Sequence, residues 1–143
     1  MKPYEQLKLK NQLCFPLYAA AKEVVGKYKP FLDGIGLTYT QYIAMMVLWE
    51  RKEIGVKELG EYLYLESSTL TPLLKRLESK GFLARNRSDR DERSVIITLT
   101  EEGERLKEQA AAVPAKLKKC LPLTENDAKT LYHLLYKLLG VSD

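Results

Sequence analysis

The chain has 143 residues, a formal net charge of +4, and 45% hydrophobic and 29% charged residues, which are ordinary values for one globular domain with a core of its own. Its positive charge is compatible with a polyanionic partner but does not require one. No run of about 18 apolar residues and no basic-then-apolar leader is present, so we expect no membrane span and no export, but a cytoplasmic protein.

The first helical pattern runs from Tyr4 to Leu32. Its apolar stripe consists of Leu7, Leu13, Leu17, Ala21, Val24, Val25 and Tyr28. Pro16 lacks an amide hydrogen and clashes with the preceding turn, which predicts a kink or a helix start there. Pro30, Gly34 and Gly36 predict a second break.

A second helix is expected in the stretch TYTQYIAMMVLWERKE. Thr38 and Gln41 have the spacing of a capping box, in which each side chain bonds the backbone of the other residue. The side chains expected to face a core are Tyr42, Met45, Met46 and Trp49. This helix is expected to support the segment that follows it.

Two closely spaced helices come next. Val56, Leu59 and Leu63 predict a short helix, which leads through Tyr64 and Leu65 into a longer one. In the longer helix Leu70, Leu73, Leu74 and Leu77 recur at i, i+3, i+4 and i+7, the pattern of one buried face. Candidate caps are Glu66, Ser67 and Ser68, and Gly81 suits the helix end. This pair has the spacing of a helix-turn-helix.

A charged hairpin is predicted directly after these helices. Two runs of β-prone residues flank the tip Ser88-Asp89-Arg90-Asp91-Glu92, and Val95, Ile97 and Leu99 alternate on one side. The DNA major groove accepts a helix, and an arginine on a thin ribbon can enter the electronegative minor groove. An amphipathic helix alone indicates only a surface helix, but the adjoining hairpin favours DNA binding.

The C-terminal part predicts two more helices. The first runs through Ala110, Val113 and Leu117 with an interruption near Pro114, and Thr124 with Asp127 begins the second. The second helix has a broad apolar stripe of Leu131, Leu134, Leu135, Leu138 and Leu139. Because one neighbour cannot cover this stripe, we expect the N-terminal and C-terminal helices to interlock with a second copy. A homodimer would also present two recognition helices, the longer helices with the leucine pattern, one DNA turn apart.

The segment from Ile54 to Gly103 resembles the winged helix-turn-helix of the MarR family of bacterial transcription regulators. Its most specific part is the wing, Asp89-Arg90-Asp91-Glu92-Arg93 followed by Ser-Val and ending in Leu99-Thr100-Glu101-Glu102-Gly103. The resemblance covers nearly the whole chain. It implies a single, mainly α domain with a small β-hairpin wing, in which residues 37–103 bind DNA and residues 1–36 and 104–143 form dimerisation helices.

The candidate DNA-binding residues lie on the recognition helix and the wing. Those expected at the major groove are Ser67, Ser68, Thr69, Thr71, Pro72, Lys75 and Arg76. Arg93 is expected to act at the wing, held by paired hydrogen bonds to Asp91. Arg85, Arg87 and Arg90 remain open between phosphate contacts and internal salt-bridge partners.

The chain has two cysteines, Cys14 and Cys120, and a single histidine, His133. Neither cysteine belongs to a CxxC or Cys/His cluster, so we expect no metal and no cofactor. One interpretation of Cys14 is a small buried hydrophobe. The other follows from the 9 tyrosines against 3 phenylalanines, because a phenol near sulfur favours the thiolate, which can attack a peroxide to give a sulfenic acid.

A closer resemblance is to the organic-hydroperoxide sensors of the OhrR subgroup. It is carried by NQLCFPLYAAAKEVVGKYKP, LTYTQYIAMMVLWE and YLYLESSTLTPLLKRLESKG. It implies that Cys14 is the peroxide-reactive thiol, that Tyr28 and Tyr39 reach it from the partner subunit, and that Tyr18 lies near the site. In two-cysteine members a C-terminal cysteine forms an intersubunit disulfide, and Cys120 occupies that place. One-cysteine members use an external thiol instead.

These features predict a repressor, not an enzyme. We expect the reduced dimer to bind an inverted-repeat operator and to release it when an organic hydroperoxide oxidises Cys14 and a Cys14–Cys120 disulfide forms. One alternative is a MarR-type repressor released by a small aromatic ligand, with Cys14 inert. A thiol peroxidase is a more distant alternative, because the sequence places no His, Lys or Arg neighbour to activate Cys14.

Overall fold

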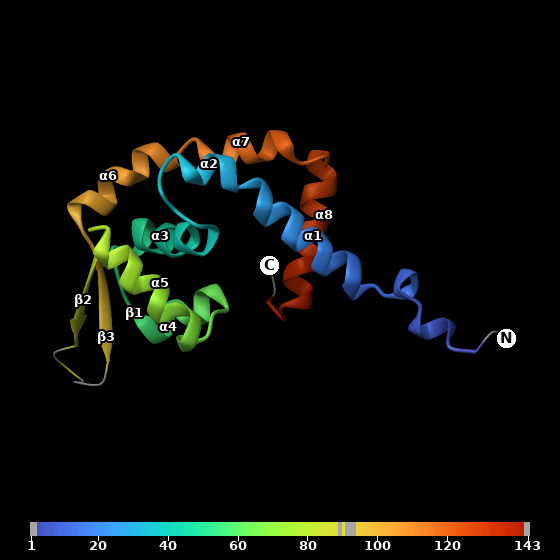
Figure 1. Ribbon diagram of the computed structural model, residues 1–143, viewed down its shortest axis with the longest axis horizontal. Helices are drawn as coiled ribbons and strands as arrows, with labels where there is room; N and C mark the ends of the chain where they lie inside the picture. The colour runs from blue at the N-terminus through green and yellow to red at the C-terminus, as the bar shows by residue number, and fades with distance from the viewer. Residues whose placement is uncertain (1–2, 89, 91–93, 142–143) are drawn as a thin grey trace.

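The computed structural model describes residues 3–88, 90 and 94–141, which form a mainly helical fold with one small sheet (Figure 1). The N-terminal half contains η1 (Glu5–Leu7), η2 (Leu9–Asn11), α1 (Cys14–Lys27), α2 (Lys29–Asp33), α3 (Tyr39–Arg51), β1 (Glu53–Gly55) and α4 (Val56–Leu63). It is followed by α5 (Ser67–Ser79), β2 (Leu83–Arg87), β3 (Val95–Leu99), α6 (Glu101–Ala110), α7 (Val113–Cys120) and α8 (Glu125–Leu138). None of the described helices is long and apolar enough to cross a bilayer.

The hydrophobic core lies between α3, α4, α5 and the sheet, which together form one lobe of the molecule (Figure 1). All four leucines of the predicted α5 stripe are buried, with at most 5% of each exposed. Met45 and Leu48 of α3 and Leu59 of α4 have no exposed surface. The expected helix-turn-helix is therefore confirmed, with each helix contributing its apolar face to a shared core.

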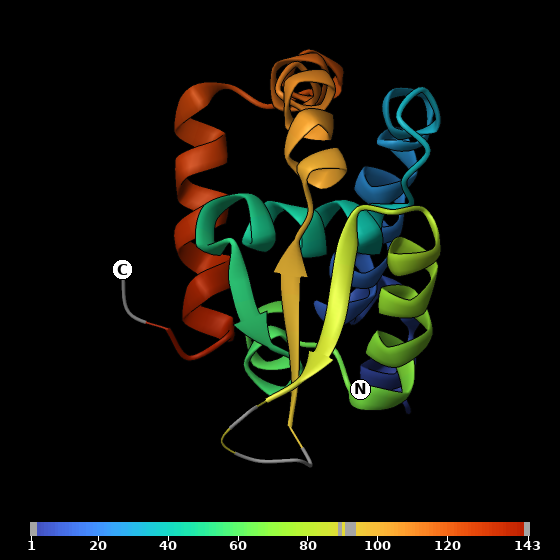
Figure 2. The same ribbon diagram turned by 90° about the vertical axis from the view of Figure 1, so that its left-hand side faces the viewer.

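The sheet has three strands in the order β1-β3-β2, all antiparallel, and Figure 2 shows β3 between its neighbours with α6 following it. Ile97 pairs with Ile54 on one side and with Arg85 on the other, and it is fully buried. The predicted hairpin is thus confirmed, but β1 was not expected. It has three residues and a single apolar side chain, so only its pairing with the distant β3 makes it a strand.

The helix ends confirm most of the expected caps. Thr38 and Gln41 form a reciprocal capping box at the start of α3, and Thr124 and Asp127 form another at α8. The predicted side-chain cap of α5 is wrong, because Glu66 holds the cap position without a side-chain hydrogen bond. Met46 is also not a core residue, since 44% of it is exposed on α3.

The proline positions confirm the expected breaks. α1 begins at Cys14, two residues before Pro16, so that proline lies in the first turn, where its missing amide hydrogen removes no helical bond. Pro30 and Pro114 are the second residues of α2 and α7, within the first turn of each helix.

Gly103 allows α6 to pack closely against the turn between α5 and β2. A β-carbon built at this residue would lie 2.2 Å from the carbonyl oxygen of Phe82 and 2.7 Å from a methyl carbon of Leu99. The buried indole of Trp49 donates a hydrogen bond of 2.8 Å to the Gly103 carbonyl. This contact joins α3, the sheet lobe and α6.

The helices α1 and α8 contribute no buried residue to their own chain. The N-terminal segment projects away from the other elements (Figure 1). The large apolar residues left exposed on or before α1 are Leu7, Leu9, Leu13, Phe15, Leu17 and Val25. Those on and after α8 are Leu131, Leu134, Leu138, Leu139 and Val141. Such an extent of apolar surface is typical of an interface rather than of a free face.

Candidate nucleic-acid interface and thiol site

A tight turn sets the angle between α4 and α5. Tyr64 caps α4 in the left-handed conformation, with a φ of 55°, and the Leu65 amide donates to the Gly60 carbonyl at 3.0 Å. A β-carbon on Gly60 would lie 2.9 Å from the Leu65 carbonyl oxygen, so the turn requires glycine there. Sequence reasoning did not single out Gly60, although a glycine inside a short apolar helix is itself a signal of a close approach.

The outer face of α5 presents donors in a row. Ser67, Ser68 and Thr69 at the helix start are exposed, as are Pro72, Lys75 and Arg76 farther along, and Thr71 is half-buried. Every candidate major-groove residue is thus at least partly accessible. Hydroxyl, ammonium and guanidinium groups on one helix face can donate to base edges and to phosphates.

The wing is fixed to the end of α5. The Arg85 amide donates to the Glu78 carboxylate at 3.2 Å, and the Thr100 hydroxyl donates to the Gly81 carbonyl at 2.6 Å. Arg90 is exposed near the tip, where its amide donates to the Ser88 hydroxyl at 3.2 Å. The other two wing candidates, Asp91 and Arg93, lie outside the described residues.

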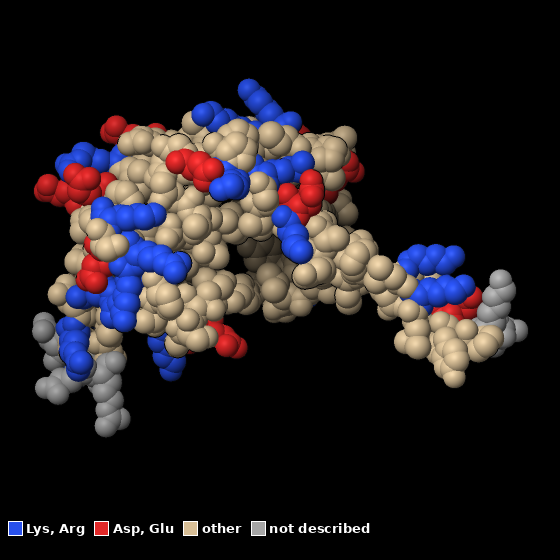
Figure 3. Space-filling view, viewed as in Figure 1, with Lys and Arg blue, Asp and Glu red and all other residues tan. Residues whose placement is uncertain are grey.

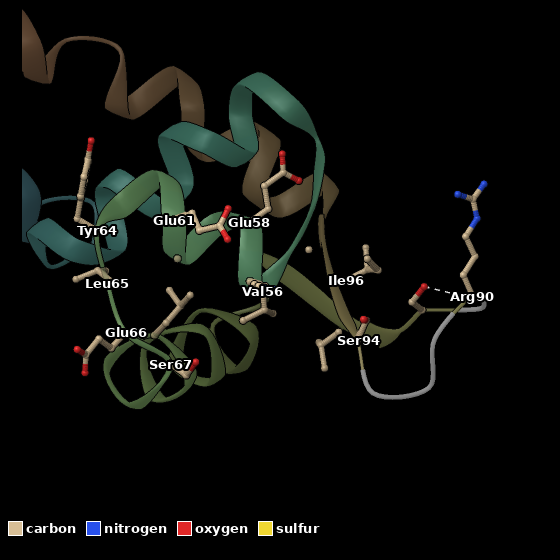
Figure 4. Close-up of a pocket in the computed structure, with 16 residues that line it drawn as sticks. Val56, Glu58, Glu61, Tyr64, Leu65, Glu66, Ser67, Arg90, Ser94 and Ile96 are labelled. Carbon is tan, nitrogen blue, oxygen red and sulfur yellow. Dashed lines mark hydrogen bonds between the residues drawn. The ribbon is translucent and has the colours of Figure 1, made fainter. Parts of the chain in front are cut away.

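A groove of about 1260 Å³ separates the wing from the start of α5 (Figure 4). Val56 of α4 and Ser67 of α5 lie on one side, and Ser94 and Ile96 at the start of β3 lie on the other, with Arg90 at the outer end. Three carboxylates, those of Glu58, Glu61 and Glu66, also line the groove, whereas Lys and Arg side chains gather over α5 and the wing in the space-filling view (Figure 3). A helix and a hairpin separated by such a groove can enter adjacent DNA grooves.

Three tyrosines form a cluster where α1 and α2 meet α3. The ring centroid of Tyr28 lies 4.8 Å from that of Tyr39 and 5.7 Å from that of Tyr42. A cavity of about 280 Å³ beside them is lined by Val25, Leu32, Leu37, Tyr28 and Tyr39, among others. The structure therefore brings together two predicted site residues and adds Tyr42, which sequence reasoning had assigned only to the core.

Burial keeps these phenols protonated. It raises the pKa of Tyr28 to about 12, with smaller contributions from Tyr39 and Tyr42. Burial also raises the pKa of Tyr39 and of Tyr42. At neutral pH each hydroxyl can therefore donate a hydrogen bond to an anion.

Both cysteines are exposed free thiols. Cys14 is the first residue of α1 and Tyr28 follows its last, so about 20 Å of helix separates them within one chain. Tyr18 lies one turn from Cys14 and is mostly exposed, with the Lys22 ammonium 5.2 Å from its ring centre. Cys120 ends α7, and its thiol donates to the Lys116 carbonyl at 3.5 Å.

One chain alone thus does not bring Cys14 to the predicted tyrosines Tyr28 and Tyr39. Nor do three or more His, Cys, Asp or Glu side chains gather as metal ligands anywhere in the part of the chain that the structure describes.

Comparison with known proteins gives consistent results. Residues 27–110 match the family described as transcriptional regulator SarA/Rot. The organic hydroperoxide resistance transcriptional regulator of Bacillus subtilis is 48% identical over 136 residues, covering 95% of this chain and 92% of that protein. Reduced AbfR bound to DNA superposes with a TM-score of 0.78 at 38% identity, covering 95% of this chain and 94% of AbfR. The disulfide form of AbfR gives a TM-score of 0.64 at the same identity, covering 95% and 92%.

Proposed function

Because this chain belongs to the MarR-type winged-helix transcription regulators, in the group of organic hydroperoxide resistance regulators, we propose that it is a repressor whose hold on its operator is controlled by oxidation of Cys14. The family consists of DNA-binding regulators and not of enzymes. The observation that carries the proposal is an exposed Cys14 thiol at the start of α1 in a chain 48% identical to a hydroperoxide resistance regulator.

The functional form is a homodimer. The exposed apolar residues on and before α1 and on and after α8 pack against those of a second copy, so that residues 1–36 and 104–143 act as dimerisation segments. This pairing removes from water an apolar surface that the chain cannot cover by itself. The winged helix-turn-helix, residues 37–103, then occurs twice in the assembly and matches an inverted-repeat operator.

Each winged helix-turn-helix occupies two neighbouring DNA grooves. The start of α5, with Ser67, Ser68 and Thr69, reads base edges in the major groove, and Lys75 and Arg76 contact phosphates farther along. The wing, with Arg90 and Arg93, reaches the minor groove, and the groove between the wing and α5 separates the two DNA-binding elements (Figure 4).

The sensing site is assembled across the dimer. Since Tyr28 lies about 20 Å of helix away from Cys14 of its own chain, and Tyr39 packs against Tyr28, these two tyrosines serve Cys14 of the other copy. Their hydroxyls keep their protons at neutral pH, because burial raises both pKa values. Two phenol donors aimed at one sulfur stabilise the thiolate, which is the nucleophilic form.

The oxidation proceeds in two steps. The Cys14 thiolate attacks one oxygen of an organic hydroperoxide, so that an S–O bond forms, the O–O bond breaks, and the alkoxide takes a proton and leaves as an alcohol. The Cys120 thiolate of the second copy then attacks the sulfenic sulfur, so that an S–S bond forms and the hydroxyl leaves as water. The peroxide gains two electrons and the two thiols lose them.

The disulfide requires the two copies to rearrange. Cysteine Cα atoms must come within about 7 Å, which moves α1 of one copy against α7 of the other. The chain superposes about equally well on reduced and on overoxidized AbfR bound to DNA, with TM-scores of 0.78 and 0.77, and less well on disulfide-formed AbfR, with 0.64, which supports a change of fold on disulfide formation. A change in the spacing of the two α5 helices then lowers operator affinity, since each half-site is held by modest contacts.

The test uses an operator selected from random DNA by the reduced protein. We expect one equivalent of an organic hydroperoxide to release the wild type and to produce a disulfide-linked dimer on a non-reducing gel. Cys14→Ser should bind DNA as tightly as the wild type and should stay bound after oxidation. Cys120→Ser should lose the linked dimer while Cys14 still becomes oxidised. Release of Cys14→Ser by peroxide would refute the sensor, and DNA retention by the wild type would favour a repressor controlled by a small aromatic ligand.

A further inference from the structure

We propose that Lys80 is a positioning residue that couples the tyrosine cluster to the recognition helix, so that a shift of the loop before Tyr39 is passed to α5. The inference rests on the proposed function and deepens it, because redox sensing requires a physical link between the thiol site and the DNA-reading surface.

The link consists of two hydrogen bonds from one ammonium group. Lys80 caps the C-terminal end of α5, and its amide bonds back to the Arg76 carbonyl at 3.1 Å. Its Nζ donates to the Gly36 carbonyl at 2.5 Å and to Oε1 of Gln41 at 3.3 Å. The same Gln41 oxygen accepts from the Thr38 amide at 3.0 Å. One side chain of the recognition helix thus bonds both the middle of the loop that connects α2 with α3, at Gly36, and the first turn of α3, at Gln41.

The loop is part of the tyrosine site. Leu37, Thr38 and Tyr39 line the cavity beside the tyrosine cluster. Gly36 has a φ of +71°, a conformation that glycine adopts without strain, so it is suited to act as a hinge. Any displacement of Tyr39 that accompanies oxidation of Cys14 therefore pulls on its neighbour Thr38, whose amide bonds the same Gln41 oxygen that Lys80 bonds.

Gln41 gives the link a fixed anchor. Its side chain is 3% exposed and completes the capping box of α3, so its position follows that of the helix. Lys80 and Gly36 are exposed, but the Lys80 ammonium is held against two oxygen atoms, one of which belongs to the buried Gln41. Hydrogen bonds from a charged donor are stronger and more directional than neutral ones, which suits a connection that has to transmit a displacement.

The sequence offers no local sign of this link. Lys80 stands between Ser79 and Gly81 at a helix end, where a basic residue is expected simply to favour the helix dipole. Its bonds reach residues 39 and 44 positions away along the chain.

The experiment measures the ratio of the operator dissociation constants of the oxidised and reduced forms in the full-length protein. Lys80→Met keeps the aliphatic stem and removes the donor, and Lys80→Arg keeps a charged donor. Lys107→Met, on the exposed face of α6, is the matched control. We expect Lys80→Met to bind DNA within about threefold of the wild type when reduced and to form disulfide at the same rate. In Lys80→Met the ratio of the oxidised to the reduced dissociation constant should fall about tenfold, the size of effect that charged hydrogen bonds in two subunits can transmit. Lys80→Arg should restore most of the ratio, and Lys107→Met should leave it unchanged.

A second measurement separates coupling from a general structural role. Lys80→Met should accelerate amide hydrogen exchange in residues 36–38 of the reduced protein while the melting temperature stays within a few degrees of the wild type.

Two results would overturn the inference while leaving the proposed function in place. The first is an unchanged ratio in Lys80→Met. The second is a weaker reduced form whose salt dependence falls by about one unit per subunit, since Lys80 would then be a phosphate contact. If the wild type itself does not respond to peroxide, the proposed function fails and the inference fails with it.

Discussion

Replacement of Gly103 by alanine tests how closely α6 packs on the sheet lobe. Helix propensity alone favours alanine over glycine by about 1 kcal/mol inside a helix, so a reader of the sequence would expect stabilisation. The structure predicts the opposite, because the new methyl group would lie 2.2 Å from the Phe82 carbonyl oxygen and 2.7 Å from a Leu99 methyl carbon. The first neighbour is backbone and cannot rotate away.

The loss of folding free energy follows from the distance that α6 has to move. To restore an ordinary contact, α6 must move by about 1 Å, and overpacking of this kind costs roughly 1–3 kcal/mol. The same movement weakens the bond from the Trp49 indole to the Gly103 carbonyl, and an unsatisfied buried donor costs about 1–3 kcal/mol. After subtraction of the propensity gain we expect a net loss of roughly 1–5 kcal/mol, or a melting temperature lower by about 3–15 °C.

Thermal unfolding at one fixed protein concentration, followed by circular dichroism, measures this loss. Gly34→Ala is the control, because Gly34 has an ordinary helical φ and the nearest atom, the Phe31 carbonyl oxygen, would lie 4.0 Å from the added carbon. We expect the control to melt within about 2 °C of the wild type. A Gly103→Ala protein that melts at or above the wild-type temperature would refute the packing argument.

Two further outcomes are expected from the DNA surface and the tyrosine cluster. Arg76 lies in the last turn of α5, so Arg76→Ala should lower the affinity for the operator and for unrelated DNA by the same factor, roughly 3- to 10-fold at moderate salt. Lys107→Ala should change neither affinity. A loss of affinity confined to the operator would instead make Arg76 a base-reading residue. The pKa of Tyr28 is raised from 10.0 to about 12, so the folded state disfavours its phenolate. The contribution of Tyr28 to the free energy of unfolding is therefore fully present below about pH 10 and is lost as the pH rises through 12. Between those pH values the melting temperature of Tyr28→Phe should therefore fall less than that of the wild type. If the melting temperatures of the two proteins fell in parallel with pH, the raised pKa of Tyr28 would be contradicted.

The parts of the fold that the sequence predicts well are those set by local pattern. The four leucines of α5, the threonine caps of α3 and α8, and the breaks at Pro16, Pro30 and Pro114 all depend on neighbours within one or two turns. The errors arise where distant parts decide. β1 is a strand only because it pairs with β3, and Met46 is exposed although its position continues an apolar stripe.

The candidate site residues also divide into those set by local sequence pattern and those set by contacts between distant parts of the chain. The exposed donor row of α5 follows directly from the leucine pattern on its opposite face, and the structure confirms its accessibility. The pairing of Tyr28 with Tyr39 came from family resemblance, because their separation along the chain carries no signal of a ring contact. The Gly60 turn and the Lys80 link depend on contacts that only the folded chain defines. Asp91 and Arg93 remain predictions.

In the proposed homodimer, the apolar surfaces of α1 and α8 would tie DNA binding to the amount of protein. Because these helices bury nothing within their own chain, the proposed dimer would form by mass action. At concentrations below the dimer dissociation constant, halving the amount of chain lowers the amount of dimer about fourfold. We therefore expect operator occupancy to fall steeply with dilution even in the absence of an oxidant.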